Sequence, residues 1–269
     1  MSPGRLVVVW VVAIAATLAG PGCSRSDSRG AGAHREVRVA AAADLRFALE
    51  DIAAEFQKRH PDIRIKSTFG SSGSFFAQLM NQAPFDMFLS ADVDYPRRLV
   101  AQGLARKETE FLYAVGRLVV WVPASSGLDL ETRGMEALAD PSVRKVSIAN
   151  PRHAPYGRAA EAAMKNLGVY EKVKDRLVLG ENVVQAAQFV ESGSADAGIL
   201  ALSLAAAPAM KDKGRYWEIP FSAYPRMDQG GVILPGAQDP QAAREFRDFL
   251  TSAEGKAVLK RYGFFLPGE

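Results

Sequence analysis

The sequence predicts an α/β protein in which mostly parallel strands are covered by helices on both faces. Short apolar stretches of strand length alternate with longer segments whose apolar residues recur at helical spacing. The chain has 269 residues, of which 48% are hydrophobic and 23% charged, which is typical of a soluble globular protein. Strands interleaved with helices in this way form sheets that are buried on both faces.

The first part of the chain already shows this alternation of strands and helices. Val37–Ala41 is an apolar run of strand length. Leu45–His60 carries apolar residues at helical spacing, and Pro61 follows directly, which favours a helix that ends there. The next expected strands are 63–69 and 87–89, and the next expected helices are 75–80 and 95–102.

The remainder of the chain continues the pattern, and no internal repeat interrupts it. Strands are expected at 118–122, 143–149, 177–179, 195–200 and 230–234. Helices are expected at 157–167, 183–191, 240–251 and 254–262.

The charge of the chain is low and evenly spread. The formal net charge is +3, and no long run of Lys or Arg occurs. A nucleic-acid-binding domain normally concentrates positive charge on one element. The sequence therefore predicts a mixed, solvated surface and no nucleic-acid partner.

The N-terminus has the features of an export signal. Arg5 precedes an apolar run, 6–22, that is short for a permanent membrane span. Cys23 is the single cysteine and is followed by a polar segment. We expect residues 1–23 to be a signal peptide with a lipoprotein cysteine at its end and 24–35 to be a tether, with plain signal-peptide cleavage as the alternative. A single cysteine provides neither an internal disulfide nor a thiolate metal site.

Three loops could form a binding site, because each joins a predicted strand to a predicted helix. They are 40–45, 69–74 and 150–157, and the first two are rich in small residues. Helix N-termini present unpaired N–H groups and partial positive charge, so they bind anions without a basic side chain. In open α/β sheets such loops gather at the carboxyl ends of the strands.

Six motifs in order give the chain a specific resemblance. They are VAAAADL at 39–45, FGSSGS at 69–74, FDMFLSAD at 85–92, NPRHAPYGRA at 150–159, Glu181-Asn182-Val183, and KRYGF at 260–264. Together they resemble the molybdate-binding proteins of ABC importers over about residues 36–265.

The resemblance implies a type II periplasmic-binding-protein fold, in which two α/β lobes with mixed, mostly parallel sheets are joined by a two-stranded hinge. The N-terminal lobe would comprise 36–115 and 228–269, and the C-terminal lobe 116–226. The ligand would be enclosed between the lobes and held by neutral donors only.

The family pattern also implies which residues hold the oxyanion. Ser72 matches a serine that donates through its hydroxyl and its backbone, and Val183 matches a valine whose backbone N–H points at the ligand. Tyr156 stands where some members supply a ligand tyrosine; other members place that tyrosine at the position of Ala201. The expected ligand residues are Ala43, Asp44, Ser71, Ser72, Tyr156 and Val183, with no direct ligand to a metal cation.

Asp44 departs from the family, because many relatives have a serine there. An ionised carboxylate has no proton to donate and repels a dianion at close range. One interpretation is that the Asp44 N–H binds the oxyanion while its carboxylate turns away to cap its own helix. The other is that the carboxylate faces the cleft and accepts a proton from a protonated anion such as hydrogen phosphate.

The expected function is capture of molybdate or tungstate by closure of two lobes, followed by delivery to an ABC permease driven by a cytoplasmic ATPase. Phosphate or sulfate is the alternative ligand. We expect a monomer on the outer face of the cell membrane or in the periplasm, with no cofactor.

An enzyme is the rival class. No Gly-x-Ser-x-Gly, His-Glu-x-x-His or nucleotide P-loop motif occurs. The three histidines are far apart in sequence. His153 lies in a candidate loop, and we expect it at the loop surface because no carboxylate or second histidine is near it in sequence.

Overall fold

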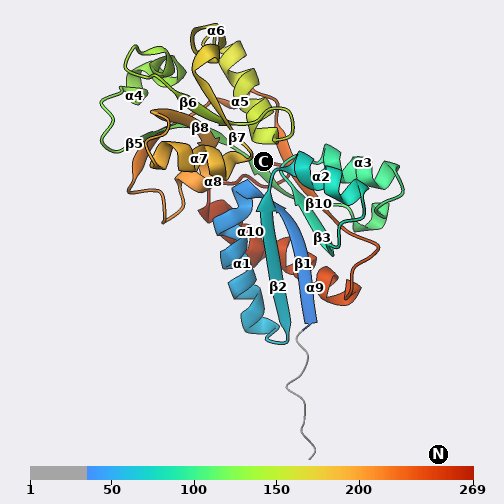
Figure 1. The fold of residues 1–269 in the computed structure, drawn as a ribbon. Coiled ribbons are helices and arrows are strands. Elements are labelled where there is room, and N and C mark those ends of the chain that lie inside the picture. Colours follow the sequence, from blue (N-terminus) through green and yellow to red (C-terminus); the bar gives the residue numbers. More distant parts are fainter. Residues whose placement is uncertain (1–34) are drawn as a thin grey trace, which may run out of the picture. The chain divides into compact units, whose positions relative to one another are not determined.

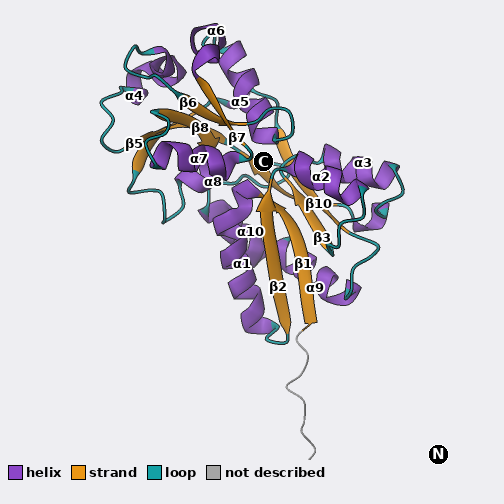
Figure 2. Cartoon of the chain, in the orientation of Figure 1, coloured by secondary structure: helices purple, strands orange, loops and turns teal. Residues whose placement is uncertain are grey.

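The computed structural model of the chain describes residues 35–269. These residues form two α/β lobes, each built on one five-stranded sheet with helices packed against it (Figures 1 and 2). The predicted α/β class and the two-lobed fold are therefore confirmed. The predicted signal peptide, Cys23 and most of the predicted tether lie outside the described residues.

The sheet of the first lobe has the strand order β2-β1-β3-β10-β4. β1 pairs in parallel with β2 and β3, whereas β10 is antiparallel to β3 and β4. Four of the five strands therefore run in the same direction. The strands are β1 (Arg35–Ala42), β2 (Ile63–Gly70), β3 (Met87–Ser90), β4 (Phe111–Gly116) and β10 (Met227–Ile233).

The sheet of the second lobe has the order β7-β6-β8-β5-β9 and repeats the same pairing pattern. β6 is parallel to β7 and β8, and β5 is antiparallel to β8 and β9. The strands are β5 (Leu118–Pro123), β6 (Val146–Ala149), β7 (Leu177–Gly180), β8 (Ala197–Ala201) and β9 (Gly214–Glu218).

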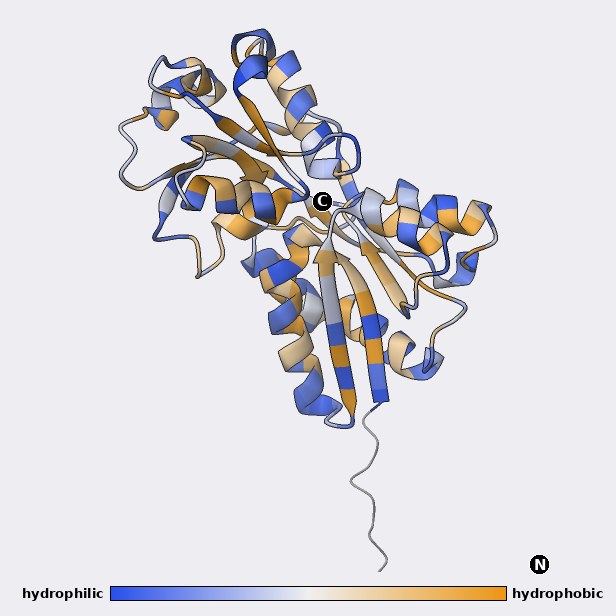
Figure 3. Ribbon diagram, in the orientation of Figure 1, coloured by the Kyte–Doolittle hydropathy of each residue, from blue (hydrophilic) through white to orange (hydrophobic). Residues whose placement is uncertain are grey.

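Helices cover both faces of each sheet, because strands that are apolar on both sides must be shielded from water. In the first lobe Val37 and Leu49 belong to one buried cluster, and Ala40 and Phe75 belong to another. In the edge strand β2, exposed residues alternate with residues that are partly or fully buried over most of its length. Figure 3 shows the matching bands of hydrophilic and hydrophobic residues. The helices of this lobe are α1 (Arg46–Arg59), α2 (Ser72–Met80), α3 (Asp94–Ala101), α9 (Pro240–Leu250) and α10 (Ala253–Arg261).

The second lobe is shielded by shorter helices around a core that includes the buried Trp121. Its helices are α4 (Leu130–Arg133), α5 (Pro155–Asn166), α6 (Tyr170–Val173), α7 (Val183–Glu191) and α8 (Leu202–Ala205). Short 3-10 turns complete the chain at Ala43–Leu45, Lys107–Thr109, Gly134–Ala139, Lys174–Arg176 and Phe221–Ala223. Among the helices of residues 35–269, none combines the length and the apolar character that crossing a membrane requires.

The chain passes between the two sheets twice. It leaves the first sheet at Gly116 and enters the second at Leu118, and it returns between Glu218 and Met227. The final segment pairs with β4 through an antiparallel bridge between Phe265 and Val115. Residues 35–269 belong to one compact unit, so the predicted lobe limits stay a prediction.

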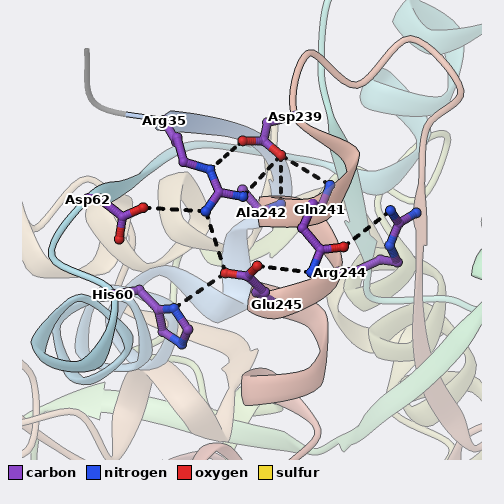
Figure 4. A network of polar contacts seen from close by, with 8 residues as sticks. All are labelled: Arg35, His60, Asp62, Asp239, Gln241, Ala242, Arg244 and Glu245. Carbon is purple, nitrogen blue, oxygen red and sulfur yellow. Dashed lines mark hydrogen bonds and ion pairs between the residues drawn. The ribbon is translucent and has the colours of Figure 1, made fainter. Parts of the chain in front are cut away.

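An ion-pair network holds the start of β1 against α9 (Figure 4). The Arg35 guanidinium donates to Asp239 at 2.5 Å and to Asp62 at 3.3 Å, and it lies 3.8 Å from Glu245. His60 approaches the same Glu245 at 3.4 Å. The hydrogen bond from Arg35, helped by two N–H groups of the first turn of α9, lowers the pKa of Asp239 to about 2. Arg35 is thereby fastened to the start of α9 through Asp239, which lies 204 positions later in the chain.

Most predicted elements are confirmed to within a few residues, and the differences have local causes. The helix expected at 75–80 begins at Ser72, because Ser71 provides a cap that the small-residue loop concealed. The strand expected at 143–149 begins only at Val146. β4 and β9 were not predicted; β9 is a largely exposed edge strand, so it lacks the apolar pattern that a buried strand shows.

Candidate functional site

A small cavity lies between the two lobes where several helices begin. Its volume is about 10 Å³, which is the space that one water-sized particle needs. All six residues expected from the sequence line it. The lining residues are Ala42, Ala43, Asp44, Gly70, Ser71, Ser72, Ala91, Ala154, Pro155, Tyr156, Asn182 and Val183.

The first lobe contributes two helix starts. After β1 the chain forms a single 3-10 turn at Ala43–Leu45 and continues directly into α1. After β2 it enters α2, where the Ser71 side chain accepts a hydrogen bond from the Ser74 N–H at 3.3 Å. Both starts follow parallel strands, so their free N–H groups lie at the carboxyl edge of the sheet.

Ser72 is the first residue of α2, and its hydroxyl is oriented by the neighbouring loop. The Ala91 N–H donates to the Ser72 Oγ at 3.0 Å, and Ser72 is buried. A hydroxyl that accepts one hydrogen bond still has its own proton to donate. Ser72 can therefore donate into the cavity.

The second lobe contributes two more helix starts. α5 begins at Pro155, whose fixed backbone geometry suits the first helical position, and Tyr156 follows it. α7 begins at Val183, and the Asn182 side chain caps it by accepting from two N–H groups at 3.0 and 3.1 Å. The Val183 N–H is not among the two that the cap engages.

Behind the cavity, three buried polar side chains form a network that we call the floor: Asp44, Tyr156 and Gln229. The Asp44 Oδ2 accepts from the Tyr156 hydroxyl at 3.0 Å and from the Gln229 amide at 2.6 Å. The same amide lies 3.3 Å from the Tyr156 oxygen. Asp44 is 1% exposed and Gln229 is fully buried. The floor thus joins the first lobe to the second through groups that water does not reach.

The floor requires glycine at position 116. A Cβ added to Gly116 would lie 2.5 Å from the Tyr156 hydroxyl oxygen and 2.8 Å from the Gln229 amide nitrogen. These distances are shorter than van der Waals contact. Gly116 ends β4, so the first crossing between the lobes passes directly beside the floor.

The expectation that the Asp44 carboxylate caps its own helix is wrong. Neither the 3-10 turn nor α1 has a side-chain cap. The carboxylate is directed to Tyr156 and Gln229 instead, because these two donors reach it from segments remote in sequence. The N–H groups of Asp44 and Leu45 still lower its pKa, although less than Gln229 and Tyr156 do.

Burial controls the protonation of the floor. Loss of water raises the pKa of the Asp44 carboxyl to about 6 against the opposing effect of its hydrogen bonds. Burial, followed by the nearby Asp44 charge, raises the pKa of Tyr156 well above its ordinary value. Tyr156 is therefore a protonated phenol, whereas Asp44 titrates close to neutral pH.

At the mouth of the cavity a second set of contacts joins the lobes, which we call the rim: Ser71, Ser74, Asp92, His153, Arg158 and Glu181. Ser74 donates to Glu181 at 2.9 Å, and Arg158 donates to Asp92 at 2.6 Å. The Gly73 N–H donates to the His153 carbonyl at 2.9 Å, so the backbones themselves meet there. A side chain at Gly73 would clash with that carbonyl.

His153 was expected at the loop surface because no carboxylate is near it in sequence; its side chain is partly buried, and the fold does bring a carboxylate to it. Its Nε2 lies 3.4 Å from Glu181, and its Nδ1 lies 2.9 Å from the Ser71 hydroxyl. Glu181 follows β7 and is 28 positions later in the chain, so only the fold brings it near. The Ser71 hydroxyl, which also bonds Ser74 at 2.8 Å, is thus occupied within the rim.

The cavity combines several uncharged donors with one acid and no basic side chain. Of residues 35–269, those lining it include no Lys, Arg or His. Helix N-termini and hydroxyl groups stabilise a compact anion. Within the same residues no group of three His, Cys, Asp or Glu side chains is arranged to hold a metal ion. The arrangement favours reversible binding of a small anion.

Two residues of this region were missed by the sequence analysis. Gln229 lies in β10, where a polar residue in an otherwise buried strand was the available signal. Ser203 donates to the Asp44 carbonyl oxygen at 2.7 Å and fixes the first loop from the second lobe.

Two α/β lobes that enclose a cavity lined by helix N-termini define a two-lobed solute-binding protein. The sequence model of the family described as bacterial extracellular solute-binding protein matches residues 37–265. The chain belongs to this family.

Individual relatives cover nearly the same region. The chain is 36% identical to the molybdate-binding protein ModA of Azotobacter vinelandii over 86% of its own length and 90% of the relative. It is 35% identical to ModA of Rhodobacter capsulatus, with 85% and 88% covered. The solved structure of the Azotobacter vinelandii periplasmic molybdate-binding protein superimposes with a TM-score of 0.80 at 33% identity, covering 86% of this chain and 99% of that one.

Proposed function

We propose that this protein captures molybdate or tungstate outside the cytoplasm and delivers it to an ABC transporter. The observation that carries the proposal is the convergence of helix starts from both lobes on one small cavity without basic side chains. The relatives with 35–36% identity are molybdate-binding proteins. A fully deprotonated tetrahedral anion matches a set of neutral donors.

Within this proposal each lobe supplies part of the donor set. Ser72 donates through its hydroxyl, and the backbone N–H groups of Ala43, Asp44, Ser71 and Val183 point from the helix starts. Tyr156 donates through its phenol. Because both lobes contribute, the bound anion stabilises the closed arrangement by contacts that an open arrangement lacks.

The proposal extends to the transport process. The loaded protein docks on a membrane permease that a cytoplasmic ATPase drives, and it acts as a monomeric binder without cofactor, turnover or nucleic-acid partner. The N-terminal segment directs export, and acylation of Cys23 anchors the protein to the outer face of the membrane. Mass spectrometry of the mature N-terminus would reveal a diacylglycerol adduct, whereas a free N-terminus near residue 23 would contradict the anchor.

Calorimetric titration tests the ligand. The purified mature protein is titrated with molybdate, tungstate, sulfate and phosphate at the same pH and salt concentration. We expect binding of molybdate or tungstate at least about 100-fold tighter than that of sulfate, since a cavity shaped for a larger anion leaves its donors out of reach of a smaller one. Each ligand that binds the folded state also raises the melting temperature. Tight sulfate or phosphate binding with no response to either metal oxyanion would refute the proposal.

A further inference from the structure

In the floor, the single hydroxyl proton of Tyr156 has two possible acceptors, the Asp44 carboxylate and an anion in the cavity. The Tyr156 hydroxyl has one proton, and in this structure it is directed to the Asp44 Oδ2 at 3.0 Å. The same proton cannot also be donated to an anion in the cavity. While Asp44 is ionised, Tyr156 presents only lone pairs, and the carboxylate adds a full negative charge to the cavity lining.

Protonation of Asp44 reverses this arrangement. A carboxylic acid donates its Oδ2–H to the Tyr156 oxygen across the same distance, which frees the phenolic proton for the anion. The Gln229 amide can remain where it is, because it can donate to the Asp44 Oδ2 or to the Tyr156 hydroxyl oxygen. The only new covalent bond is the O–H of Asp44, and its proton comes from the solvent buffer.

Two unpartnered oxygens fit a neutral Asp44 better than a charged one. The Asp44 Oδ1 and the Gln229 Oε1 are buried without a hydrogen-bond partner among the described residues. A buried carboxylate normally accepts several hydrogen bonds, and leaving one oxygen bare is costly. A neutral acid carries less charge on that oxygen, so the cost is smaller.

Among residues 35–269, no basic side chain forms a hydrogen bond or ion pair with the Asp44 carboxylate. Tyr156 of α5 and Tyr113 of β4 are buried phenols whose pKa values burial raises well above the ordinary range. Ser203 of α8 donates to the Asp44 carbonyl oxygen. The rim residues Arg158 and Glu181 contact Asp92 and His153.

We propose that Asp44 takes up one proton when the anion binds, so that capture of a doubly negative oxyanion is coupled to protonation and Tyr156 becomes a donor to it. Gln229 is the positioning residue, because its amide contacts both the Asp44 carboxyl group and the Tyr156 hydroxyl and holds them at hydrogen-bonding distance. This inference rests on the proposed function, since it concerns the same cavity.

The sign of the coupling follows from linkage. Burial raises the pKa of Asp44 to about 6 without ligand. A dianion in the cavity raises it further, so the complex holds more protons than the free protein above pH 6. Affinity therefore falls as pH rises, by up to about tenfold per pH unit while the pH lies between the two pKa values.

Calorimetry of the mature protein in two buffers of different ionisation enthalpy measures the proton directly. We titrate molybdate between about pH 6.5 and about pH 8.5 and expect uptake approaching about one proton per anion near pH 7.5. In Asp44→Asn, whose amide donates to Tyr156 at every pH, we expect no proton uptake and a flat pH profile. Its affinity at pH 8 should exceed that of wild type by up to about 100-fold, because pH 8 lies about two units above the pKa of Asp44 in the free protein.

His153→Gln is the control, because this imidazole lies at the mouth of the same cavity, in contact with the Ser71 hydroxyl and near Glu181, but does not contact Asp44. It should keep the proton uptake and the pH slope. Tight molybdate binding by the wild type without proton uptake would overturn this inference and leave the proposed function intact, as would a pH slope that survives in Asp44→Asn. No binding of molybdate or tungstate at any pH would overturn both.

Discussion

The floor and the rim of the cavity join the same two lobes through different kinds of contact: buried hydrogen bonds in the floor and largely exposed polar contacts in the rim. In the floor, Asp44, Tyr156 and Gln229 are at most 3% exposed and share one carboxylate oxygen. In the rim, the side chains of Arg158 and Glu181 are 41% and 58% exposed and form ion pairs. Floor contacts are shielded from water, whereas rim contacts compete with it.

The difference separates two tasks of the interface. Exposed ion pairs contribute about 0–1 kcal/mol each and weaken with salt, so the rim can form and break at little cost during opening and closing. Buried polar groups lose hydration, so an unmade contact in the floor costs about 1–3 kcal/mol or more. We therefore expect the floor to govern which ligand is accepted and the rim to govern how easily the lobes part.

The largest effect is expected when Asp44→Asn removes the carboxylate charge: the free energy of unfolding without ligand should rise. The pKa of Asp44 is about 6 in the folded protein against an ordinary 3.8. The folded state thus binds the proton more tightly, and stability from this group is present at low pH and lost as pH rises through 6. At about 1.4 kcal/mol per pKa unit, Asp44→Asn should be more stable than wild type by up to about 3 kcal/mol at pH 8, and the difference should vanish below about pH 3.

Urea unfolding of the two proteins over this pH range measures the difference. Asp239→Asn is the matched control with the opposite sign, because the Arg35 hydrogen bond lowers the pKa of Asp239 to about 2. That substitution should destabilise the protein at neutral pH, and its cost should shrink as pH falls towards 2. An Asp44→Asn difference independent of pH would contradict the view that burial dominates the floor.

A smaller effect is expected from the hydroxyl of Ser72. Ser72→Ala removes a donor to the anion and leaves the Ala91 N–H without its acceptor. A hydrogen bond to a charged ligand contributes about 1.5–3 kcal/mol, so molybdate affinity should fall about 10- to 150-fold. Ser74→Ala, two positions along the same helix but in the rim, should change affinity by less than about threefold. Equal effects of the two substitutions would contradict the assignment of Ser72 as a donor to the anion.

The smallest effect is expected from the rim ion pair. Arg158→Gln removes the contact with Asp92 across the lobes. Affinity at about 0.15 M salt should fall by no more than about fivefold, and the difference from wild type should shrink at about 1 M salt. Arg59→Gln, which breaks the exposed pair with Glu254 within the first lobe, should leave affinity unchanged. A loss of 100-fold in Arg158→Gln would show that the rim, too, decides ligand binding.

Much of the fold and the outline of the site followed from local patterns. Apolar runs and helical spacing located β1, β2, α1 and α7 to within about two residues, because each of these elements buries a continuous apolar face. The exposed edge strand β9 has no such face and was missed. The three strand-to-helix loops contain five of the six expected ligand residues, and the family resemblance singled these out together with Val183. All six are among the twelve residues that line the cavity.

The sequence by itself determined that short loops would lead into helices at the ends of parallel strands, since strand, loop and helix preferences act over a few neighbouring residues. Only the tertiary structure decided what surrounds Asp44. Its partners Tyr156 and Gln229 are 112 and 185 positions away. The protonation of a carboxyl depends on the water it loses and the donors it meets. Both are set here by remote segments: β10 of the first-lobe sheet brings Gln229, and α5 of the second lobe brings Tyr156.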